Sequence, residues 1–391
     1  MKNKWNPCPN ILGRLIMIKN ILVFLVVTLA ISGCQSTFGP VALEQTHPAY
    51  NKSISETLSE QMLINLVRLR YRDQPSFLEI SSVTVSPRIS TSANFDTSID
   101  LGSGGNVIQP GVGIEYSQSP TISYTPLRGE DFLKSVLSSI SLEAILVMTQ
   151  SGWSIERVFG MTIERMNDLF NAPSASGPTP TLEPKHHENF ARALEIFRHL
   201  QREGVMEIGP NIQVNSGDHV NNKPELIMQF YPENRPGDGD LESETIELQS
   251  LLGTTATDHK VIISSDFLNK HPNVISLRVR SIMGVLFYLS QNIKVPDKHK
   301  EAGLVTVTKT KEGDEFNWSN TPAGKHFIVY SSKERPENAY ISVPHRGYWF
   351  YIADNDLQTK SSFFLIQQLF SLQAGQSEAK GPTLTLPVGG R

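Results

Sequence analysis

The chain has 391 residues, of which 39% are hydrophobic and 19% are charged, so it can bury packed cores and is not wholly disordered. Its 35 basic and 39 acidic residues give a formal net charge of −4, which argues against a protein that coats nucleic acid, and we predict no nucleic-acid partner. The length predicts two or three domains of ordinary size.

The chain begins with the pattern of an export signal. Residues 1–33 contain no acidic residue and four basic ones, Lys2, Lys4, Arg14 and Lys19. The apolar run Ile21–Ile31 would span roughly 16 Å as a helix, about half of the ~30 Å hydrocarbon core of a bilayer, which suits a signal peptide better than a transmembrane helix. We expect residues 1–33 to be a signal peptide, with translation starting at Met1 or at Met17.

A cysteine follows the apolar run in the string Ile31-Ser32-Gly33-Cys34. This string resembles the lipobox of bacterial lipoproteins. The resemblance implies cleavage between Gly33 and Cys34, a diacylglycerol on the Cys34 thiol, and an acyl chain such as palmitate on the freed amine. Two or three acyl chains anchor a protein durably, whereas one anchors it only marginally. The alternative is an ordinary secretory signal with a cysteine at this place by chance.

The residue after the cysteine is Gln35 and not aspartate, which in the sorting rule of bacterial lipoproteins implies the outer membrane. We therefore expect a lipoprotein held in the cell outer membrane by the lipid on Cys34, with its body facing the periplasm. Without residues 1–33 the chain keeps 31 basic and 39 acidic residues, a net charge of −8. Cys34 is then its one cysteine, which excludes an internal disulfide and a thiol nucleophile.

The mature chain predicts an α+β fold. We expect a polar, lipidated tether at 34–50 and an N-terminal α+β domain at 51–172. In this domain Ser53–Glu56 is a capping box that predicts a helix start, and the Ser/Thr-rich segment 77–125 alternates and predicts strands joined as hairpins. Such alternation is typical of a sheet with a polar face or of a β-ribbon between subunits. Helices are predicted over 128–140, 142–148 and 155–169.

Four prolines in Pro173–Pro184 predict a stiff linker between two domains. The C-terminal α+β domain would cover 185–391, with a further division near 295–303 as an option. Lys185–Glu203 has its apolar residues on one face and predicts an amphipathic helix. The other predicted elements are strands at 205–208, 212–214, 226–231, 304–308, 327–330, 339–343 and 347–352, helices at 241–252, 277–289 and 361–372, and an edge strand at 384–387.

The motifs of common enzyme classes are incomplete in this sequence. It lacks Gly-x-Ser-x-Gly, and Gly102–Val107 lacks the third glycine of a dinucleotide-binding loop. His186-His187-Glu188 is not continued to His-Glu-x-x-His, and Asp238–Glu244 lacks the distant glutamate of a calcium loop. Ala323–His326 lacks the upstream glycine of a phosphate loop. We therefore assign no catalytic residue, no metal ligand and no cofactor, and we favour a protein that is not an enzyme.

One stretch near the C-terminus combines polar and aromatic residues. His345 and Arg346 precede Tyr348 and Trp349 in an aromatic strand. Such a strand could line a ligand groove or a protein contact, so these four residues form a candidate binding surface. The alternative is a strand with both faces covered, in which the aromatic residues serve packing.

Three segments, Asn65–Arg70, Ser151–Trp153 and Arg346–Trp349, resemble those of uncharacterised Gram-negative envelope lipoproteins, a resemblance that implies no activity and no site residues. The leading hypothesis is a non-enzymatic interaction or assembly component of the cell envelope, with other envelope proteins or further copies of the chain as partners. The alternative is a periplasmic hydrolase or small-ligand binder whose site lies near His345 and Arg346.

Overall fold

The structure is a computed structural model that describes residues 38–98, 107–178, 182–184, 187–211, 225–231, 239–255, 259–267, 271–374 and 384–387. The predicted signal peptide and Cys34 lie outside these residues. The chain divides into two compact units, Met1–Leu58 and Ser59–Arg391. Among the described residues, no helix is both long and apolar enough to cross a membrane.

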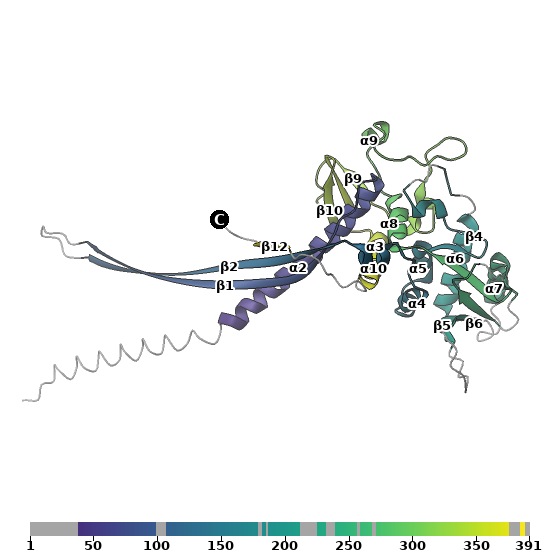
Figure 1. Ribbon diagram of the computed structural model, residues 1–391, viewed down its shortest axis with the longest axis horizontal. Coiled ribbons are helices and arrows are strands. Elements are labelled where there is room, and N and C mark those ends of the chain that lie inside the picture. Colours follow the sequence, from purple (N-terminus) through teal and green to yellow (C-terminus); the bar gives the residue numbers. More distant parts are fainter. Residues whose placement is uncertain are drawn as a thin grey trace, which may run out of the picture. The chain divides into compact units, whose positions relative to one another are not determined.

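The fold is α+β, as predicted (Figure 1). The described helices are α2 (Phe38–Arg70), α3 (Glu130–Leu137), α4 (Leu142–Gln150), α5 (Ile155–Thr162), α6 (His187–Glu203), α7 (Gly239–Leu252), α8 (Ile282–Ser290), α9 (Asp297–Glu301) and α10 (Leu357–Ala374), with 3-10 turns η1 (Pro173–Ser176), η3 (Trp318–Asn320) and η4 (Gly324–His326). The described strands are β1 (Phe77–Ser98), β2 (Val107–Leu127), β3 (Ile163–Met166), β4 (Leu169–Phe170), β5 (Met206–Asn211), β6 (Glu225–Phe230), β7 (Lys260–Ser264), β8 (Val274–Val279), β9 (Tyr330–Ser332), β10 (Ala339–His345), β11 (Tyr348–Ala353) and β12 (Leu384–Pro387).

The central sheet has six strands in the order β4-β3-β8-β7-β6-β5. Its neighbours are antiparallel except for β7 and β8, which run parallel. Strands β3 and β4 precede the predicted linker at 173–184, and the other four strands follow it. The sheet therefore continues across that segment. Since Ser59–Arg391 is one compact unit, the boundaries predicted at 173–184 and near 295–303 do not divide the structure.

A buried arginine directly after β8 explains why the proline-rich segment does not act as a linker. Arg280 is 2% exposed, and its guanidinium donates hydrogen bonds to four backbone carbonyls, those of Met161 (3.4 Å), Ile163 (2.8 Å), Asn171 and Ala172 (3.3 Å). Its Nε donates to Ser176 Oγ at 2.9 Å. Burial lowers the pKa of Arg280 to about 10, so the side chain remains charged at neutral pH. The chain at the start of the predicted linker is thus held to the sheet.

Asn171 also makes buried hydrogen bonds, which hold the chain where it leaves β4. Its Nδ2 donates to the carbonyl oxygens of Gly160 and Ile163, both at 2.8 Å, and its Oδ1 accepts from Tyr288 Oη at 2.8 Å. The ring of Tyr288 also lies under the guanidinium of Arg280, 4.2 Å from its carbon to the ring centroid. These buried polar groups satisfy one another's hydrogen-bonding capacity. Backbone carbonyls that have no partner strand can therefore lie within the core.

The helix predicted over 155–169 is shorter in the structure. α5 ends at Thr162, and Ile163 has extended backbone angles and starts β3. Asn167 then adopts a φ of 49°, which lets the chain reverse into β4, and its Oδ1 accepts from Ser276 N at 2.8 Å. Pairing with β8, more than a hundred residues away, therefore replaces the last turns of the predicted helix.

The segment 277–289 is divided between a strand and a helix, so the helix predicted there is only partly correct. Residues up to Val279 belong to β8, and α8 begins at Ile282 after an N-cap in which Ser281 Oγ accepts from Gly284 N at 3.0 Å. Both elements are buried and almost wholly apolar, so hydrophobic periodicity cannot separate them.

The helix predicted over 185–203 is confirmed as α6, and its predicted apolar face is buried. The residues of that face are Phe190, Ala193, Leu194, Phe197 and Leu200. Gly204 follows with a φ of 68°, a left-handed backbone that ends the helix. The helix predicted at 241–252 is confirmed as α7. Of the neighbouring predicted strands, 205–208 and 226–231 correspond to β5 and β6, and 212–214 lies outside the described residues.

α2 begins at Phe38, well before the predicted helix start at Ser53. It takes in most of the predicted tether 34–50, including Pro48. The Ser53–Glu56 motif lies inside the helix, where the hydroxyl of Thr57 donates to the carbonyl of Ser53 at 2.8 Å. A Ser-x-x-Glu motif caps a helix only where its serine itself has non-helical backbone angles, and here Ser53 lies within α2.

Two amide side chains of α2 direct the chain into β1. Asn65 donates from Nδ2 to Ser76 O at 2.7 Å and accepts from Ser76 N at 2.9 Å. Gln61 makes the same pair of bonds with Leu78, at 2.9 Å and 2.7 Å. Each amide thus binds the strand as a neighbouring strand would. Phe77 between them is buried and stacks on Phe370, with ring centroids 4.7 Å apart.

β1 and β2 form one long antiparallel hairpin, which we call the ribbon, where the sequence predicted several shorter strands. The pairing runs from Phe77 opposite Leu127 to Ser98 opposite Val107, with a register shift between Ile80 and Ser82. β12 adds a short third strand beside β2, with Leu384 opposite Tyr124. The edge strand predicted at 384–387 is therefore confirmed.

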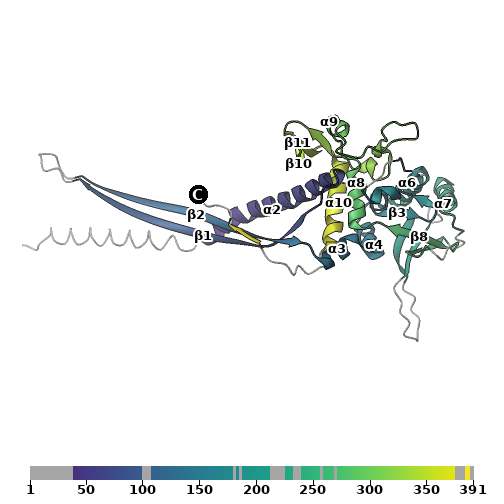
Figure 2. The ribbon, with the colours of Figure 1, turned by 45° about the horizontal axis from the view of Figure 1, so that its top comes forward.

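The last third of the described chain agrees largely with prediction. β10 and β11 match the predicted strands, β9 begins where the strand predicted at 327–330 ends, and α10 extends the helix predicted at 361–372 in both directions. The strand predicted at 304–308 belongs to none of the three described sheets. α10 packs beside α3 and α8, as Figure 2 shows.

Replacing Arg280 should destabilise the whole unit Ser59–Arg391. The variant Arg280→Met leaves several buried carbonyls without a donor, so the free energy of unfolding should fall by about 3–5 kcal/mol. Urea unfolding followed by circular dichroism measures this change.

Arg278→Met is the matched control, because it removes the same group two residues earlier, within β8, where the side chain is 58% exposed. It should change the free energy of unfolding by about 0.5 kcal/mol or less. Equal losses in the two variants would show that Arg280 does not hold the turn as described.

Candidate functional site

The four residues of the predicted binding surface lie on the β10–β11 hairpin. His345 and Tyr348 face each other at its end, and Arg346 and Gly347 form the two-residue turn. Arg346 has a φ of 49° and Gly347 a φ of 79°, the left-handed backbone that a tight hairpin turn of this kind requires. A glycine accepts this backbone freely, whereas an arginine does so at some cost, so contacts of the Arg346 side chain must compensate.

Those contacts are made with Asp73, which follows the end of α2. Arg346 Nη2 lies 2.9 Å from Asp73 Oδ1 and 3.1 Å from Oδ2, and His345 Nε2 lies 3.3 Å from Oδ2. The guanidinium of Arg346 also covers the ring of Tyr71 at 5.2 Å. The hairpin turn is therefore fastened to the C-terminal end of α2 through one carboxylate and one aromatic ring.

Tyr71 is the centre of an aromatic cluster on the same face of the hairpin. Its ring lies 5.0 Å from the ring of His345 and 6.0 Å from that of Phe350, and its hydroxyl lies 2.7 Å from His299 Nδ1. The ring of His299 in turn packs edge-on against Tyr348 at 5.0 Å. The structure thus brings His345, Arg346 and Tyr348 together and adds three partners that the sequence did not indicate, Tyr71, Asp73 and His299.

Trp349 lies on the opposite face of β11 from Tyr348, as strand alternation requires. Arg335 lies over its ring at 5.1 Å, while Lys333 lies over the ring of Tyr348 at 4.9 Å. Both Tyr348 and Trp349 are partly exposed. Three of the predicted residues therefore share one cluster, and Trp349 does not belong to it.

Burial sets the protonation of this cluster. It lowers the pKa of His299, and the neighbouring charge of Arg346 lowers it further. Burial, together with the charges of Arg346 and Arg68, also lowers the pKa of His345, although the carboxylate of Asp73 acts in the opposite direction. The pKa of Tyr71 rises to about 12, chiefly because the phenol is desolvated. At neutral pH the two imidazoles are therefore uncharged, and Tyr71 can donate its proton to His299 Nδ1.

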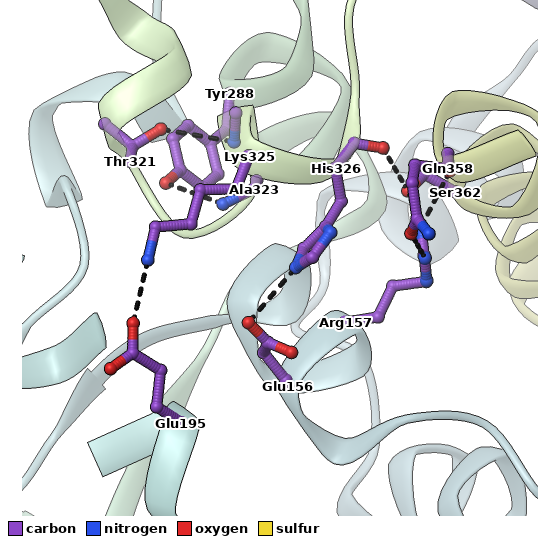
Figure 3. A network of polar contacts seen from close by, with 11 residues as sticks. Glu156, Arg157, Glu195, Tyr288, Thr321, Ala323, Lys325, His326, Gln358 and Ser362 are labelled. Carbon is purple, nitrogen blue, oxygen red and sulfur yellow. Dashed lines mark hydrogen bonds and ion pairs between the residues drawn. The ribbon is translucent and has the colours of Figure 1, made fainter. Parts of the chain in front are cut away.

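A second polar network joins α5, α6, η4 and α10 (Figure 3). His326 Nε2 lies 3.2 Å from Glu156 Oε1, and the hydrogen bond from this imidazole is the main reason why the pKa of Glu156 is lowered. Lys325 Nζ binds Glu195 at 3.0 Å. Arg157 donates to Gln358 O at 2.8 Å. Lys325, the lysine of the incomplete phosphate-loop motif Ala323–His326, thus pairs with a carboxylate of α6.

This network also depends on a glycine. A Cβ added at Gly324 would lie 1.8 Å from the carbonyl oxygen of Trp318, so the turn η4 can form only with glycine at this place. The groups in the network come from four elements and pair with each other. Its arrangement is that of a structural clamp.

Of the two histidines in the incomplete zinc motif His186-His187-Glu188, His186 lies outside the described residues and His187 takes part in packing. His187 Nδ1 lies 3.2 Å from the carbonyl of Pro184 and its ring packs against Phe316, while His199 pairs with Glu244 at 2.5 Å. In the part of the chain that the structure describes, no group of three His, Cys, Asp or Glu side chains could hold a metal ion.

Two pockets lie along the central sheet, away from the predicted surface. One has a volume of about 290 Å³ and is lined by Asn167, His271 and Ser276 among others. The other is a broader groove of about 740 Å³ beside the start of α4 and the end of β7. In the first pocket, the amide of Asn167 is already bonded to the backbone, since Nδ2 donates to Leu252 O at 2.7 Å. Neither pocket is lined by His345, Arg346, Tyr348 or Trp349.

No family model, no curated protein and no solved structure matches this chain. What the protein does must therefore be argued from its own sequence and geometry.

Acid should destabilise the protein through the Tyr71 cluster. Folding lowers the pKa of His299 and His345 below the ordinary 6.5. As the pH falls, these two imidazoles therefore bind protons in the unfolded chain before they do so in the folded protein. The free energy of unfolding should therefore decrease below about pH 6.5 and level off below the folded-state pKa values. His299→Asn keeps an acceptor for Tyr71 and should reduce this slope, as measured by urea unfolding between about pH 5 and pH 7.5.

His271→Asn serves as the control, because His271 is exposed and lies outside the cluster. This variant should keep the slope of the unmodified protein. If His299→Asn also keeps it, the pH dependence has another origin and the description of the cluster is incorrect.

Proposed function

We propose that this protein is a lipoprotein of the outer membrane that faces the periplasm and acts as a non-enzymatic assembly component of the cell envelope. The observation that carries the proposal is the position of Cys34, directly after the apolar run Ile21–Ile31 and the small residues Ser32 and Gly33. This pattern gives the chain an export signal and a lipid attachment point within 34 residues. Two or three acyl chains on that cysteine would hold the body at the membrane surface.

The ribbon supports the assembly part of the proposal. Two strands of 22 and 21 residues are far longer than the usual five or six, and among the described strands only β12 extends their sheet. A two-stranded hairpin is marginally stable by itself in water. An element of this kind suits a protein whose task is contact with another chain.

The contacts at the β10–β11 hairpin do not favour the alternative, a hydrolase or a small-ligand binder with its site near His345 and Arg346. Asp73 binds both of these side chains, and the imidazole of His299 accepts from Tyr71. The polar groups there fasten the hairpin to α2. We therefore develop no second function from this cluster.

Removing the lipid attachment point should release the protein from the membrane. Cys34→Ala should abolish labelling by a fatty-acid probe and move the body to the soluble periplasmic fraction, because the described helices include none that could cross a bilayer. Mass spectrometry of the natural protein should find a mature chain that starts at an acylated Cys34.

Cys8→Ala is the matched control, since it removes a thiol from the signal segment and should leave both labelling and membrane attachment unchanged. Attachment of the Cys34→Ala protein to membranes, or a mature chain that still contains residues 1–33, would contradict the proposed anchoring.

A further inference from the structure

The register of the ribbon separates two kinds of residue. From Ser82 opposite Ser123 to Ser98 opposite Val107 the pairing is unbroken. Successive positions in a strand alternate between the two faces of a sheet, so odd-numbered positions of β1 share a face with even-numbered positions of β2. We call the positions 83–97 (odd) and 108–122 (even) the apolar face, and the remaining positions between 82 and 123 the polar face.

The two faces differ sharply in composition. Thirteen of the sixteen positions on the apolar face are apolar or aromatic, and the exceptions are Thr91, Thr97 and Gln118. The three charged residues of this paired stretch, Arg88, Asp96 and Glu115, all belong to the polar face, where Ser, Thr, Asn, Gln and Gly occupy all other positions except Val107. The ribbon is thus amphipathic over its length, which a hairpin with solvent on both faces does not require.

The prolines of the ribbon indicate how a partner would approach. Pro87, Pro110 and Pro120 all occupy apolar-face positions. In an antiparallel pair, hydrogen-bonded and non-hydrogen-bonded residue pairs alternate, so all apolar-face pairs belong to one class. Since proline cannot donate to the ladder, this class is the non-hydrogen-bonded one, and its backbone groups point to the outer edges.

The prolines therefore remove hydrogen-bond donors from both outer edges of the ribbon. Proline on an edge strand hinders the addition of a further strand by main-chain pairing. The apolar face has no such obstacle. Association through the face is thus favoured over association through the edges.

We propose that the apolar face of the ribbon packs against the apolar face of a second copy of this chain, as two sheets stack. At ~3.4 Å per residue and ~4.8 Å between strands, the face measures roughly 55 Å by 10 Å, so two stacked ribbons would bury on the order of 1,100 Å². This is close to the lower end of the roughly 1,200–2,000 Å² of stable interfaces. A face without charge is complementary to itself, as an interface with twofold symmetry requires.

The inference rests on the proposed function in one respect. Copies anchored in the same membrane meet at a high effective concentration, so an interface of this modest size suffices. A membrane surface is a less suitable occupant of the apolar face, because amphipathic elements that lie on membranes carry Lys and Arg on their polar side. Here that side has one basic residue, Arg88, against Asp96 and Glu115.

A cysteine scan along β1 in isolated membranes tests the proposal. Cys8 lies in the predicted signal and Cys34 would be lipidated, so one introduced cysteine is the one free thiol of the mature chain. Cysteines at Ile89, Thr91 and Ala93 belong to the apolar face, and those at Ser90, Ser92 and Asn94 are matched neighbours on the polar face. Treatment with a short bismaleimide should give a product of doubled mass at least about three times more often at the odd-numbered positions.

The outcomes separate the two proposals. Equal cross-linking at odd and even positions, or none at any position, would overturn the stacking of ribbons while the membrane fractionation still supports the anchor. Labelling of the odd-numbered cysteines by a photoreactive lipid in place of the doubled mass would assign the face to the bilayer, which also overturns the inference. Cross-linking of the chain without an introduced cysteine would mean that Cys34 carries a free thiol, and the proposed anchor itself would fail.

A charge substitution provides a second, independent test of the contact between ribbons. Ile89→Asp places a carboxylate on the apolar face and should remove the doubled-mass product of the Ala93→Cys protein in isolated membranes, because an unpaired charge in an interface is costly. Ser90→Asp adds the same charge to the polar face and should leave this product unchanged. Equal thermal unfolding of both variants shows that the folded unit is intact, and an Ile89→Asp protein that keeps its doubled mass would contradict the proposal.

Discussion

The described unit Ser59–Arg391 depends on a buried cation that binds backbone carbonyls. Arg280 reaches from the end of β8 to carbonyls at the start of β3 and after β4. Its Nε also donates to the hydroxyl of Ser176, which in turn donates to Glu164 Oε2 at 2.7 Å. A guanidinium with five donors in a planar fork can satisfy several acceptors at once, which a lysine cannot do. Because the carbonyls belong to a turn between strands, this one side chain lets a single sheet include strands from both sides of a proline-rich segment.

Side-chain amides also bind backbone groups that have no partner strand. Asn171 binds carbonyls at the end of α5, Asn167 holds β8 next to β3, and Asn65 and Gln61 hold the first residues of β1 against α2. An amide carries both a donor and an acceptor, so it can replace the partner strand that the chain lacks at these points. The ribbon is thereby joined to α2 by hydrogen bonds between side-chain amides and backbone groups, and not only by the packing of Phe77.

The two polar clusters and the ribbon have different relations to function. The cluster around Tyr71 and the network around Glu156 and His326 use their charged groups to hold elements together, so their perturbed protonation is a consequence of folding. The ribbon has a composition that folding of the chain by itself does not explain. Its one apolar and one polar face are the basis of the proposed contact between copies, and the predicted lipid anchor would determine where that contact is made.

The amino-acid sequence alone determined the properties that depend on local pattern. The helices α6, α7 and α10 and the edge strand β12 each follow from spacing, capping or alternation within a few residues, because each element repeats its own period. The export signal and the lipid attachment at Cys34 are predictions that rest on the same kind of local pattern. The tertiary structure alone decided where strong local signals compete or where partners are distant. It ended α5 at Thr162, divided 277–289 into β8 and α8, and placed Asp73 against Arg346, 273 positions away. Those outcomes depend on hydrogen bonds and ion pairs between segments that are remote in sequence, and no local period records which remote group will be the partner.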